Sequence, residues 1–393
     1  MEKILKLLKS KTVKNMAYYV GNSGLRIVYL VIALFSKTSN KKVVFFNYNG
    51  KGYGDNPKYV AKKIYELDPN IEMVWMIKEK DSKMPEYIKQ VKLFSISGMK
   101  ECASAKVWIS NARLHLFLYK KKSQKYFQLW HGGCGPKKIE GAAADKMISW
   151  YKTAAKHDSK MADYFVSNSK FNTKMIRESF WYSGEILNYG SPRHDPFFLH
   201  DISSNKQLEK ELKIDSTDKL ILYAPTFRND KNTAIYRWDY AKLLTAAKNY
   251  FGGTWKFVLR LHPNINFLDA EFEFGNDIVN GSQYDDMQEL IQRADIIVTD
   301  YSGVMMQAAL AGKYVMLLIP DKREYLDERG LCIDIEKAPF PKGSNCEDLV
   351  NIIYKQNVEE YKENLRKFLS TFEFYDDGFA SNRVASKVLE YME

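Results

Sequence analysis

The sequence predicts an α/β protein with two domains, each built around a mostly parallel sheet. The chain has 393 residues, which is long enough for two separate cores. From Lys41 onward, short apolar runs of strand length alternate with segments of helical pattern. Several of these runs end in glycine or polar residues, where α/β proteins bind ligands. The polar, lysine-rich segment Ser203–Asp218 marks the linker, so we assign residues 41–203 to the first domain and 204–393 to the second.

The composition points to an anionic partner. The chain carries 59 basic and 48 acidic residues, a net charge of +11, which suits nucleic acid, anionic lipid or phosphorylated substrates. Its four cysteines have no paired spacing, so neither a disulfide framework nor a cysteine metal site is expected, and a reducing cytosolic setting fits them. The apolar part of the N-terminus is not followed by a small-residue cleavage site, so no export signal is expected.

Residues 1–40 form a separate N-terminal segment. Between Met1 and Ser10, isoleucine and leucine alternate with lysine at helical spacing, and the apolar run Ile27–Phe35 follows later. That run is well below the roughly 20 residues needed to span a bilayer. We expect an amphipathic segment that lies on an anionic membrane surface. The alternative is a pair of helices packed on the protein's own body.

The first domain begins with a strand, a polar glycine loop and a helix. The loop is Lys51–Pro57, and the helix runs from there to Leu67. A second helical segment covers Ala142–His157. The strands that we predict are Val43–Phe46, Ile71–Ile77, Lys106–Ser110, Tyr126–Trp130 and Tyr164–Ser167.

His131 is the candidate base of this domain. It follows a predicted strand directly and precedes the glycine-rich segment Gly132–Lys138, which ends in two lysines. An imidazole with a pKa of about 6.5 accepts a proton near neutral pH without a large environmental shift. Glycines let a substrate approach the backbone, and the lysines would supply charge for a phosphate. A structural histidine at a strand end is the alternative. Arg193, in the turn Asn188–Asp195, is either an ion-pair partner or a phosphate ligand.

The second domain places polar side chains after three successive strands. The stretch Asp295–Gly303 reads as a strand and a tight turn, and the helix Val304–Ala311 follows, with free amides at its start that attract phosphate. Gly312 closes that helix, and Val315–Ile319 is the next strand. The polar residues at the three strand ends are Thr226 with Arg228, Arg260 with His262, and Thr299 with Asp300 and Ser302. Together they predict a pocket for a nucleotide diphosphate.

At these clusters the sequence resembles the CDP-glycerol glycerophosphotransferase family of teichoic acid synthesis. The resemblance covers about Gly52 to Gly330 and rests on the order and spacing of several short motifs. These are Gly52–Lys58, Gln128–Gly132 with Lys137 and Lys138, Gly190–Arg193 with Asp195, Tyr223–Arg228, Arg260–Pro263, Ala294–Ser302 and Glu328–Gly330.

The resemblance implies two Rossmann-like domains in a glycosyltransferase-B arrangement, attached peripherally to the cytoplasmic face of the membrane. It implies transfer of a polyol phosphate from a CDP-polyol to a hydroxyl of a polyprenyl-diphosphate-linked acceptor, with release of CMP. By the same resemblance His131 is the base and His262 a second catalytic histidine beside the diphosphate. The residues expected to hold the donor are Trp130, Gly132, Gly133, Cys134, Arg193, Pro225, Thr226, Arg228, Arg260, Leu261, Thr299, Asp300, Ser302, Gly303 and Gln307. We expect no cofactor and no essential metal, because no carboxylate cluster with metal-like spacing accompanies them.

The sequence departs from the family pattern at three places. Gly303 stands where the family commonly has a second serine, Gln307 where it has an acid, and the segment after His131 differs from the commoner Gly-Thr-Pro-Leu. The donor is therefore CDP-glycerol first, with CDP-ribitol or another CDP-alcohol as the alternative. Whether one unit or many are added, whether the acceptor belongs to wall teichoic acid or capsule, and the oligomeric state are left open.

Two other classes of protein are alternatives to this function. A nucleotide-sugar glycosyltransferase of the same fold is the nearest rival, and it would release a nucleoside diphosphate instead of CMP. A nucleic-acid-binding or lipid-binding protein that uses the +11 charge is disfavoured, because the aromatic residues do not alternate with basic ones in a recognisable RNA-binding pattern and the polar strand ends would have no role.

Overall fold

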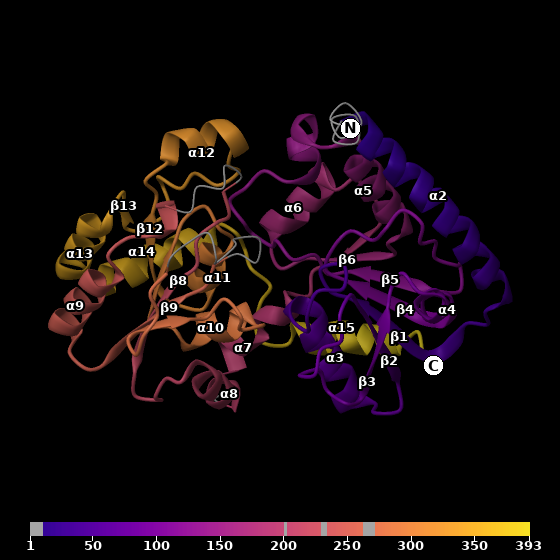
Figure 1. Ribbon diagram of the computed structural model, residues 1–393, viewed down its shortest axis with the longest axis horizontal. Coiled ribbons are helices and arrows are strands. Elements are labelled where there is room, and N and C mark those ends of the chain that lie inside the picture. The colour runs from indigo at the N-terminus through magenta and orange to yellow at the C-terminus, as the bar shows by residue number, and fades with distance from the viewer. Residues whose placement is uncertain (1–10, 200–202, 229–233, 262–271) are drawn as a thin grey trace, which may run out of the picture. The chain divides into compact units, whose positions relative to one another are not determined.

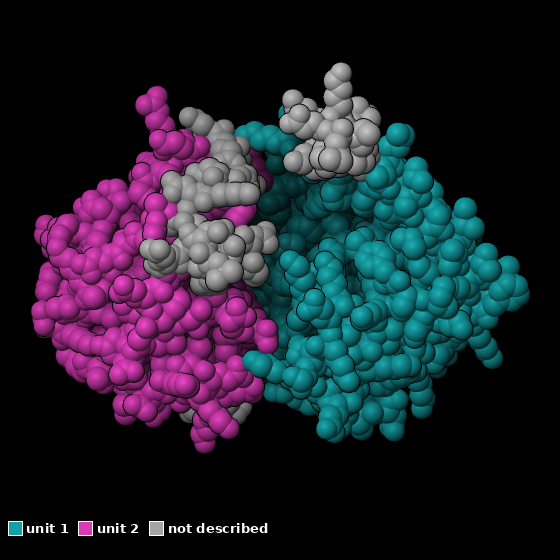
Figure 2. All heavy atoms as spheres, viewed as in Figure 1, with its two compact units in different colours: residues 1–131, 139–193, 375–393 teal, residues 132–138, 194–374 magenta. Residues whose placement is uncertain are grey.

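The computed structural model describes residues 11–199, 203–228, 234–261 and 272–393 (Figure 1). The chain forms two compact units, coloured separately in Figure 2. Unit 1 comprises the described residues up to His131 together with Ile139–Arg193 and Tyr375–Glu393, and unit 2 comprises Gly132–Lys138 and His194–Phe374. The sequence placed one boundary at 203 and all C-terminal helices in the second domain. The observed units instead exchange two segments, because the glycine-rich loop packs on unit 2 and the last helix packs on unit 1.

Unit 1 contains a seven-stranded sheet in which all neighbouring strands are parallel, in the order β3-β2-β1-β4-β5-β6-β7. This is the doubly wound order, whose switch point lies between β1 and β4. The strands are β1 Ser39–Phe46, β2 Glu72–Ile77, β3 Ile88–Lys92, β4 Ala105–Ser110, β5 Lys125–Gln128, β6 Tyr164–Val166 and β7 Glu185–Leu187.

Both faces of this sheet are buried, which explains why its strands are almost continuously apolar. Successive side chains of a strand point to opposite faces. Val43 and Phe45 accordingly enter one core cluster, and Val44 and Phe46 enter the other. Helices α3 and α15 contribute to the first cluster, and helices α2 and α4 to the second. The helices and 3-10 helices of unit 1 are α2 Lys11–Phe35, α3 Asp55–Leu67, α4 Ile96–Ser104, η1 Glu140–Lys146, α5 Ser149–Met161, α6 Lys170–Ser179 and α15 Ala380–Leu389, while η2 Pro192–His194 spans the boundary with unit 2.

Helix α2 differs from the predicted N-terminal segment. It is one helix of 25 residues, and its part Asn15–Phe35 is, by length and composition, long and apolar enough to cross a membrane. The predicted apolar run Ile27–Phe35 is thus the last part of a longer helix, which continues on both sides of Arg26, the only charged residue between Asn15 and Phe35. The predicted lysine-containing start, Met1–Ser10, lies outside the described residues.

Unit 2 contains a six-stranded parallel sheet in the order β10-β9-β8-β11-β12-β13, again with the doubly wound pattern and a switch point between β8 and β11. Helices α9 and α13 pack over one face through Leu243, Leu244, Leu349 and Ile353. The strands are β8 Lys219–Tyr223, β9 Trp255–Leu259, β10 Ile278–Asn280, β11 Ile296–Thr299, β12 Tyr314–Leu318 and β13 Lys342–Gly343. The helices are α7 Asp195–Leu199, α8 Ser203–Leu212, η3 Ala234–Tyr236, α9 Tyr240–Phe251, α10 Met287–Arg293, α11 Val304–Leu310, α12 Lys322–Arg329, α13 Cys346–Lys355 and α14 Val358–Ser370.

The α/β class and the parallel sheets predicted from the sequence are confirmed, as are the strands that precede the candidate site residues. The helix predicted over Ala142–His157 begins only at Ser149, because the preceding residues form the 3-10 helix η1. There Gly141 approaches α6 so closely that a Cβ would lie 2.7 Å from the carbonyl oxygen of Ser179. The short strands β3, β7, β10 and β13 have too little apolar pattern to be predicted.

Candidate active site

In each unit the candidate residues lie at the carboxyl ends of strands at the switch point or next to it. In unit 1, Asn47 and Asn111 follow β1 and β4, which flank the switch point, and Trp130 with His131 follows the neighbouring strand β5. In unit 2, Thr226 follows β8 and Asp300 follows β11. Neighbouring strands of opposite winding leave an opening at this point of a parallel sheet, which is where such folds bind ligands.

His131 is held by a hydrogen bond that sets its tautomer. Its Nδ1 lies 2.6 Å from the carbonyl oxygen of Asn111, which can only accept. Nδ1 therefore carries the proton, and Nε2 keeps a lone pair. The ring of the half-buried His131 stacks on Trp130, with ring centroids 4.5 Å apart, and Tyr48 lies 5.2 Å away on centroids.

The electrostatic surroundings keep His131 neutral near pH 7. Burial lowers the pKa of its imidazole below the ordinary value of 6.5, against the hydrogen bond to Asn111 and the nearby charge of Asp55. Arg193 lowers this pKa further, and Glu140 raises it. A neutral imidazole with a free Nε2 is the state that a general base requires.

Asp55 links this histidine to Arg193. Its Oδ2 accepts hydrogen bonds from the Tyr48 hydroxyl at 2.8 Å and from Nη1 of Arg193 at 2.7 Å. Arg193 is buried, with 3% exposure, and Asp55 is also buried. The structure thus places Arg193 in an ion pair with Asp55, the first of the two roles that the sequence left open for it.

Asn56 joins the same loops from the other side. Its amide nitrogen donates to the carbonyl oxygen of Trp130 at 2.7 Å, and its Oδ1 accepts from the Ser191 hydroxyl at 2.9 Å and the Arg193 backbone at 3.0 Å. The loop after β1 is thereby tied to the loops after β5 and β7. Sequence reasoning assigned no role to Asp55 or Asn56, although both lie in the polar glycine loop Lys51–Pro57.

Backbone strain gathers around His131. The residues with positive φ include Tyr48 at 42°, Asp55 at 56°, Trp130 at 51° and Glu140 at 52°. Residues other than glycine rarely adopt this conformation, and it persists only where surrounding contacts enforce it. The hydrogen bonds and ring contacts around His131 therefore hold these loops in conformations that their residues do not favour on their own.

A buried ionic cluster around Arg113 packs against the ring of Trp130. The guanidinium of Arg113 pairs with Glu140 at 2.8 Å and with Asp158 at 3.0 Å, and it lies 5.3 Å from the Trp130 ring centroid. Trp130 itself is buried in the core of unit 1. Its structural surroundings are those of a packing residue that orients His131, although the sequence placed it among the donor-binding residues.

In unit 2, Asp300 joins the loops after β8 and β11. Its two carboxylate oxygens accept the Thr226 backbone amide at 2.9 and 3.0 Å. The Thr299 hydroxyl donates to the carbonyl oxygen of Ala224 at 2.7 Å. The side chains of Thr299 and Asp300 are buried, so they shape the switch point. The buried Pro225 lies between Ala224 and Thr226 in the loop after β8.

Arg228 completes this arrangement with all of its guanidinium nitrogens engaged. Nη2 pairs with Asp300 at 2.9 Å, Nε pairs with Asp321 at 2.6 Å, and Nη1 donates to the Thr226 carbonyl at 2.8 Å. Burial acts against the charge of Arg228, but the hydrogen bonds and charges of the two carboxylates outweigh it and raise its pKa. Its contacts are those of a residue that stabilises the loop around Thr226.

Arg260 retains unused hydrogen-bonding capacity. Its Nη1 donates to the Ser282 carbonyl, while its buried Nε has no hydrogen-bond partner among the residues that the structure describes. Burial lowers the pKa of its guanidinium, against the charges of Asp285 and Asp286. Leu261 is buried in the core with 1% exposure, so only its backbone could meet a ligand. His262 lies outside the described residues.

The glycine-rich loop after His131 packs on unit 2. Residue 137 pairs with Leu331 in an antiparallel bridge, and the Cys332 amide donates to the Pro136 carbonyl at 2.7 Å. Gly133 has a φ of 44°, which favours glycine, and Cys134 is buried. A Cβ on Gly135 would lie 3.8 Å from Cα of Gly303, so this loop reaches the start of α11. Lys137 Nζ lies 3.5 Å from the Thr226 hydroxyl.

Helix α11 begins beside this loop. Gly303 is its N-cap residue without a side-chain cap, and Ser302 Oγ accepts the Val304 amide at 3.3 Å. Gln307 points its Oε1 to Nε2 of Gln288 at 2.7 Å, so its own NH₂ group remains to donate elsewhere. Of the predicted residues, unit 2 therefore brings together the glycine-rich loop, Thr226, Ser302, Gly303 and Gln307.

Sequence comparison identifies the family. The profile of the family described as CDP-Glycerol:Poly(glycerophosphate) glycerophosphotransferase matches residues 28–390. A teichoic acid poly(glycerol phosphate) polymerase of Bacillus spizizenii is 28% identical, over 92% of this chain and 95% of the relative. A teichoic acid glycerol-phosphate transferase of Staphylococcus aureus is also 28% identical, over 92% of this chain and 97% of the relative.

Structure comparison gives the same result. The wall teichoic acid polymerase TagF, in a histidine-to-asparagine variant soaked with CDPG, superposes with a TM-score of 0.83. It is 25% identical, and the match covers 97% of each chain. The resemblance found in the sequence motifs is confirmed, and so is a CDP-glycerol-dependent transferase activity. The chain belongs to the CDP-glycerol glycerophosphotransferase family.

Proposed function

We propose that this enzyme transfers glycerol phosphate from CDP-glycerol to a hydroxyl of a polyprenyl-diphosphate-linked glycan or teichoic acid acceptor and releases CMP. His131 is the general base. The observation that carries this role is the 2.6 Å contact between His131 Nδ1 and the Asn111 carbonyl, which leaves Nε2 free to accept a proton. The lowered pKa of His131 keeps that nitrogen unprotonated at neutral pH.

The reaction needs one proton transfer and one exchange of phosphorus–oxygen bonds. Nε2 of His131 takes the proton of the acceptor hydroxyl as its oxygen attacks the phosphorus that carries glycerol. The bond from this phosphorus to the bridging oxygen breaks, and CMP departs with that oxygen. The imidazolium formed is stabilised by the buried carboxylate of Asp55, and the proton passes to solvent or to CMP.

The donor belongs to unit 2 in this proposal. Phosphoryl transfer is accelerated mainly by positioning and by positive charge near the non-bridging oxygens. The unused Nε of Arg260 and the amides of Ser302 and Gly303 are groups that suit a diphosphate. The charge of Arg228 next to Thr226 is already paired, since Asp300 and Asp321 neutralise it. His262 keeps its predicted place beside the diphosphate.

We infer further that the two units adopt a glycosyltransferase-B arrangement. Each has its own doubly wound sheet with its candidate residues at the carboxyl ends of the strands. This division suits a reaction in which one unit holds the base and the other holds the nucleotide. No cofactor or metal takes part in the proposed step.

The membrane attachment is proposed from the outward face of α2. Its inner face packs on unit 1 through Leu25, Tyr29 and Ile32, while its outward face exposes only apolar and small residues along most of its length. Leu34 is 79% exposed and Phe35 is 82% exposed. A soluble helix normally carries charged residues on such a face, so we assign this one to the surface of the cytoplasmic leaflet.

The test of the function is CMP release by the purified protein. CDP-glycerol or CDP-ribitol is supplied with a lipid-linked acceptor analogue, and CMP is quantified by chromatography. Acceptor-dependent CMP release with CDP-glycerol preferred is the expected result. A preference for CDP-ribitol would correct the donor, and the amide of Gln307 in place of an acid is the feature that favours this alternative. Turnover only with nucleotide sugars, giving a nucleoside diphosphate, would refute the proposal.

A further inference from the structure

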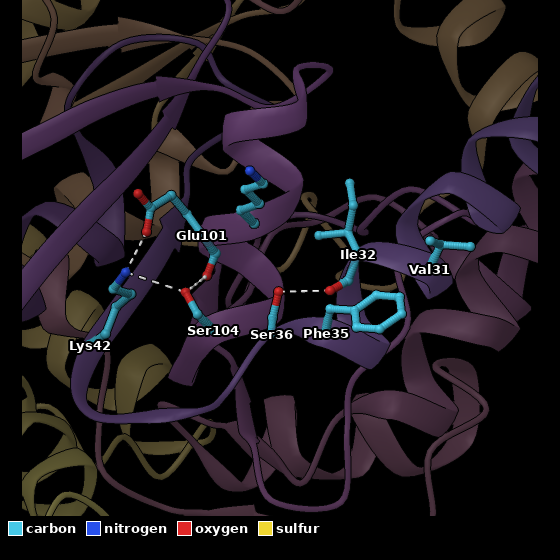
Figure 3. A pocket seen from close by; sticks show the side chains of 8 residues that line it. Val31, Ile32, Phe35, Ser36, Lys42, Glu101 and Ser104 are labelled. Atoms are coloured by element: carbon cyan, nitrogen blue, oxygen red, sulfur yellow. Dashed lines mark hydrogen bonds and ion pairs between the residues drawn. The ribbon is translucent and has the colours of Figure 1, made fainter.

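A cavity of about 550 Å³, partly open to solvent, lies in unit 1 between the C-terminal end of α2 and helix α4 (Figure 3). Its size falls within the roughly 300–1,000 Å³ range of small-ligand sites. It is remote in sequence from the strand ends that carry His131, and none of its lining residues belongs to the candidate active site. The cavity therefore needs an explanation of its own.

The lining of this cavity is divided by polarity. Val31, Ile32 and Phe35 of α2 form an apolar wall, and Lys42, Glu101 and Ser104 form a polar side opposite them (Figure 3). The apolar wall is continuous with the outward face of α2, since Val31 is 54% exposed and Phe35 is 82% exposed. A ligand in this cavity would meet hydrocarbon on one side and charged groups on the other.

The side chains on the polar side of the cavity are held by hydrogen bonds and ion pairs with one another. The ammonium of Lys42 donates to Glu101 at 2.5 Å and to the Ser104 hydroxyl at 3.3 Å, and it pairs with Glu72 at 3.2 Å. Glu101 also accepts from Lys89 at 2.6 Å. These carboxylates are thus neutralised by lysines and do not repel an anion strongly.

Lys100 supplies the charge that remains. It is exposed, it lines the cavity, and it forms no hydrogen bond or ion pair with any described residue. Together with Lys42 and Lys89 it gives this cluster three positive charges against the two of Glu72 and Glu101. An ammonium without a partner beside an apolar wall is complementary to an anionic amphiphile.

We propose that this cavity binds one anionic phospholipid of the bilayer, with its phosphate at Lys100 and the start of an acyl chain along Val31 and Phe35. The inference rests on the proposed seating of α2 on the membrane. This site would select lipids with anionic headgroups. It would also set the depth at which unit 1 sits on the bilayer surface.

The test uses the full chain in solution without vesicles. A short-chain phosphatidylglycerol, below its micelle concentration, is titrated into the protein and binding is followed by calorimetry, with short-chain phosphatidylcholine and inorganic phosphate as comparisons. We expect saturable binding of phosphatidylglycerol, about five-fold weaker binding of phosphatidylcholine and no binding of phosphate, because both the chain and one lysine contact contribute.

Two variants examine the two sides of the cavity. Ser104→Phe fills the space and should abolish binding. Lys100→Glu should weaken binding of phosphatidylglycerol by at least about five-fold, because it reverses the one unpaired charge. Lys62→Glu, at another exposed lysine of unit 1 on α3, is the matched control and should bind as the parent does.

Equal binding by the Lys100→Glu and Lys62→Glu proteins would overturn the proposal, even if Ser104→Phe proved unstable. Equal or tighter binding of an isoprenoid phosphate such as geranyl phosphate would overturn the choice of a phospholipid. Failure of the membrane proposal is recognised separately, since flotation with vesicles would then be lost while binding of the soluble lipid persisted.

Discussion

The carboxylate of Asp55 and the guanidinium of Arg193, 138 positions apart in the sequence, form a buried ion pair of 2.7 Å next to His131. Asp55 raises the pKa of His131 and Arg193 lowers it. The pair thus joins the loops after β1 and β7 and also adjusts the basicity of the histidine. We therefore expect this contact to affect both the stability of unit 1 and the proposed role of His131 as the base.

Replacement of His131 by alanine should lower kcat by about 10²–10⁴-fold, the usual contribution of a general base. The CDP-glycerol affinity should change little, because the donor is assigned to unit 2. Stopped-time CMP assays and donor titration by calorimetry measure the two quantities. A His131→Ala protein with near-parental kcat would remove the histidine from the role of base.

The pH dependence of kcat/KM should report the surroundings of His131. Because burial lowers its pKa, the acidic limb of the profile should fall below pH 6.5. Asp55→Asn removes a charge that raises this pKa, while Arg193 continues to lower it and Glu140 to raise it, so the limb should move to still lower pH. The plateau should also fall, because a weaker base transfers the proton less effectively. A limb that moved upward in the variant would contradict this electrostatic role.

The stability of unit 1 should depend strongly on the buried pair. Arg193→Met leaves Asp55 buried without its cation, and the cost should be about 3–5 kcal/mol in the free energy of unfolding. Lys174→Met, which removes an exposed pair with Glu178 at 3.8 Å, is the control and should cost less than about 1 kcal/mol. Urea denaturation gives both values.

The effect of Arg193→Met should diminish in acid. Burial alone would raise the pKa of Asp55, but Arg193 and the Asn56 amide outweigh it, so the folded pKa lies below the ordinary value of 3.8. A carboxyl group with a depressed folded pKa stabilises the protein above the unfolded pKa, and this stabilisation is lost as pH falls through the folded pKa. In the variant, burial without Arg193 raises the pKa of Asp55, so the difference between the parent and the variant should shrink as pH falls from that raised pKa toward the lowered pKa of the parent. A constant difference in unfolding free energy over that range would show that the loss of stability does not arise from the charge of Asp55.

Arg260 should contribute mainly to donor binding. Its unused Nε can donate a charge-assisted hydrogen bond, which is worth about 1.5–3 kcal/mol, so Arg260→Ala should raise the KM for CDP-glycerol by about 10–100-fold. Arg237→Ala, at an exposed arginine of the same unit, should leave KM unchanged. Initial rates over a range of donor concentrations distinguish the two. Equal KM values would exclude Arg260 from the donor site.

The outward face of α2 should determine membrane binding. Leu34→Glu with Phe35→Glu places two charges on its most exposed apolar positions and should release the protein from anionic vesicles, as measured by flotation. CMP release with a water-soluble acceptor analogue should persist, because Leu34 and Phe35 lie just before the start of β1, whereas His131 follows the carboxyl end of the parallel strand β5 at the opposite edge of the sheet. Val358→Glu, at an exposed apolar position of unit 2, is the control and should still float. Unchanged flotation of the double variant would place the membrane contact elsewhere.

The order of elements was predictable because local pattern determines it. Apolar runs such as Val43–Phe46 are buried on both sheet faces, and a polar or glycine residue follows where the strand ends. The positions of His131, Thr226 and Asp300 at strand ends follow from that rule alone. The family resemblance likewise depends on short motifs, which can be recognised in the sequence without knowledge of the structure between them.

The partners of these side chains were decided only by the tertiary structure. The doubly wound strand order, the ion pair of Asp55 with Arg193 and the full engagement of Arg228 by two carboxylates join residues that no local pattern connects. The same holds for the return of α15 to unit 1 and the attachment of Gly132–Lys138 to unit 2. The sequence by itself determined which chemical groups stand at the strand ends, because hydrophobic periodicity is local. Which of those groups are neutralised by a partner and which remain open to a ligand depends on packing between distant segments, and only the folded chain settles it.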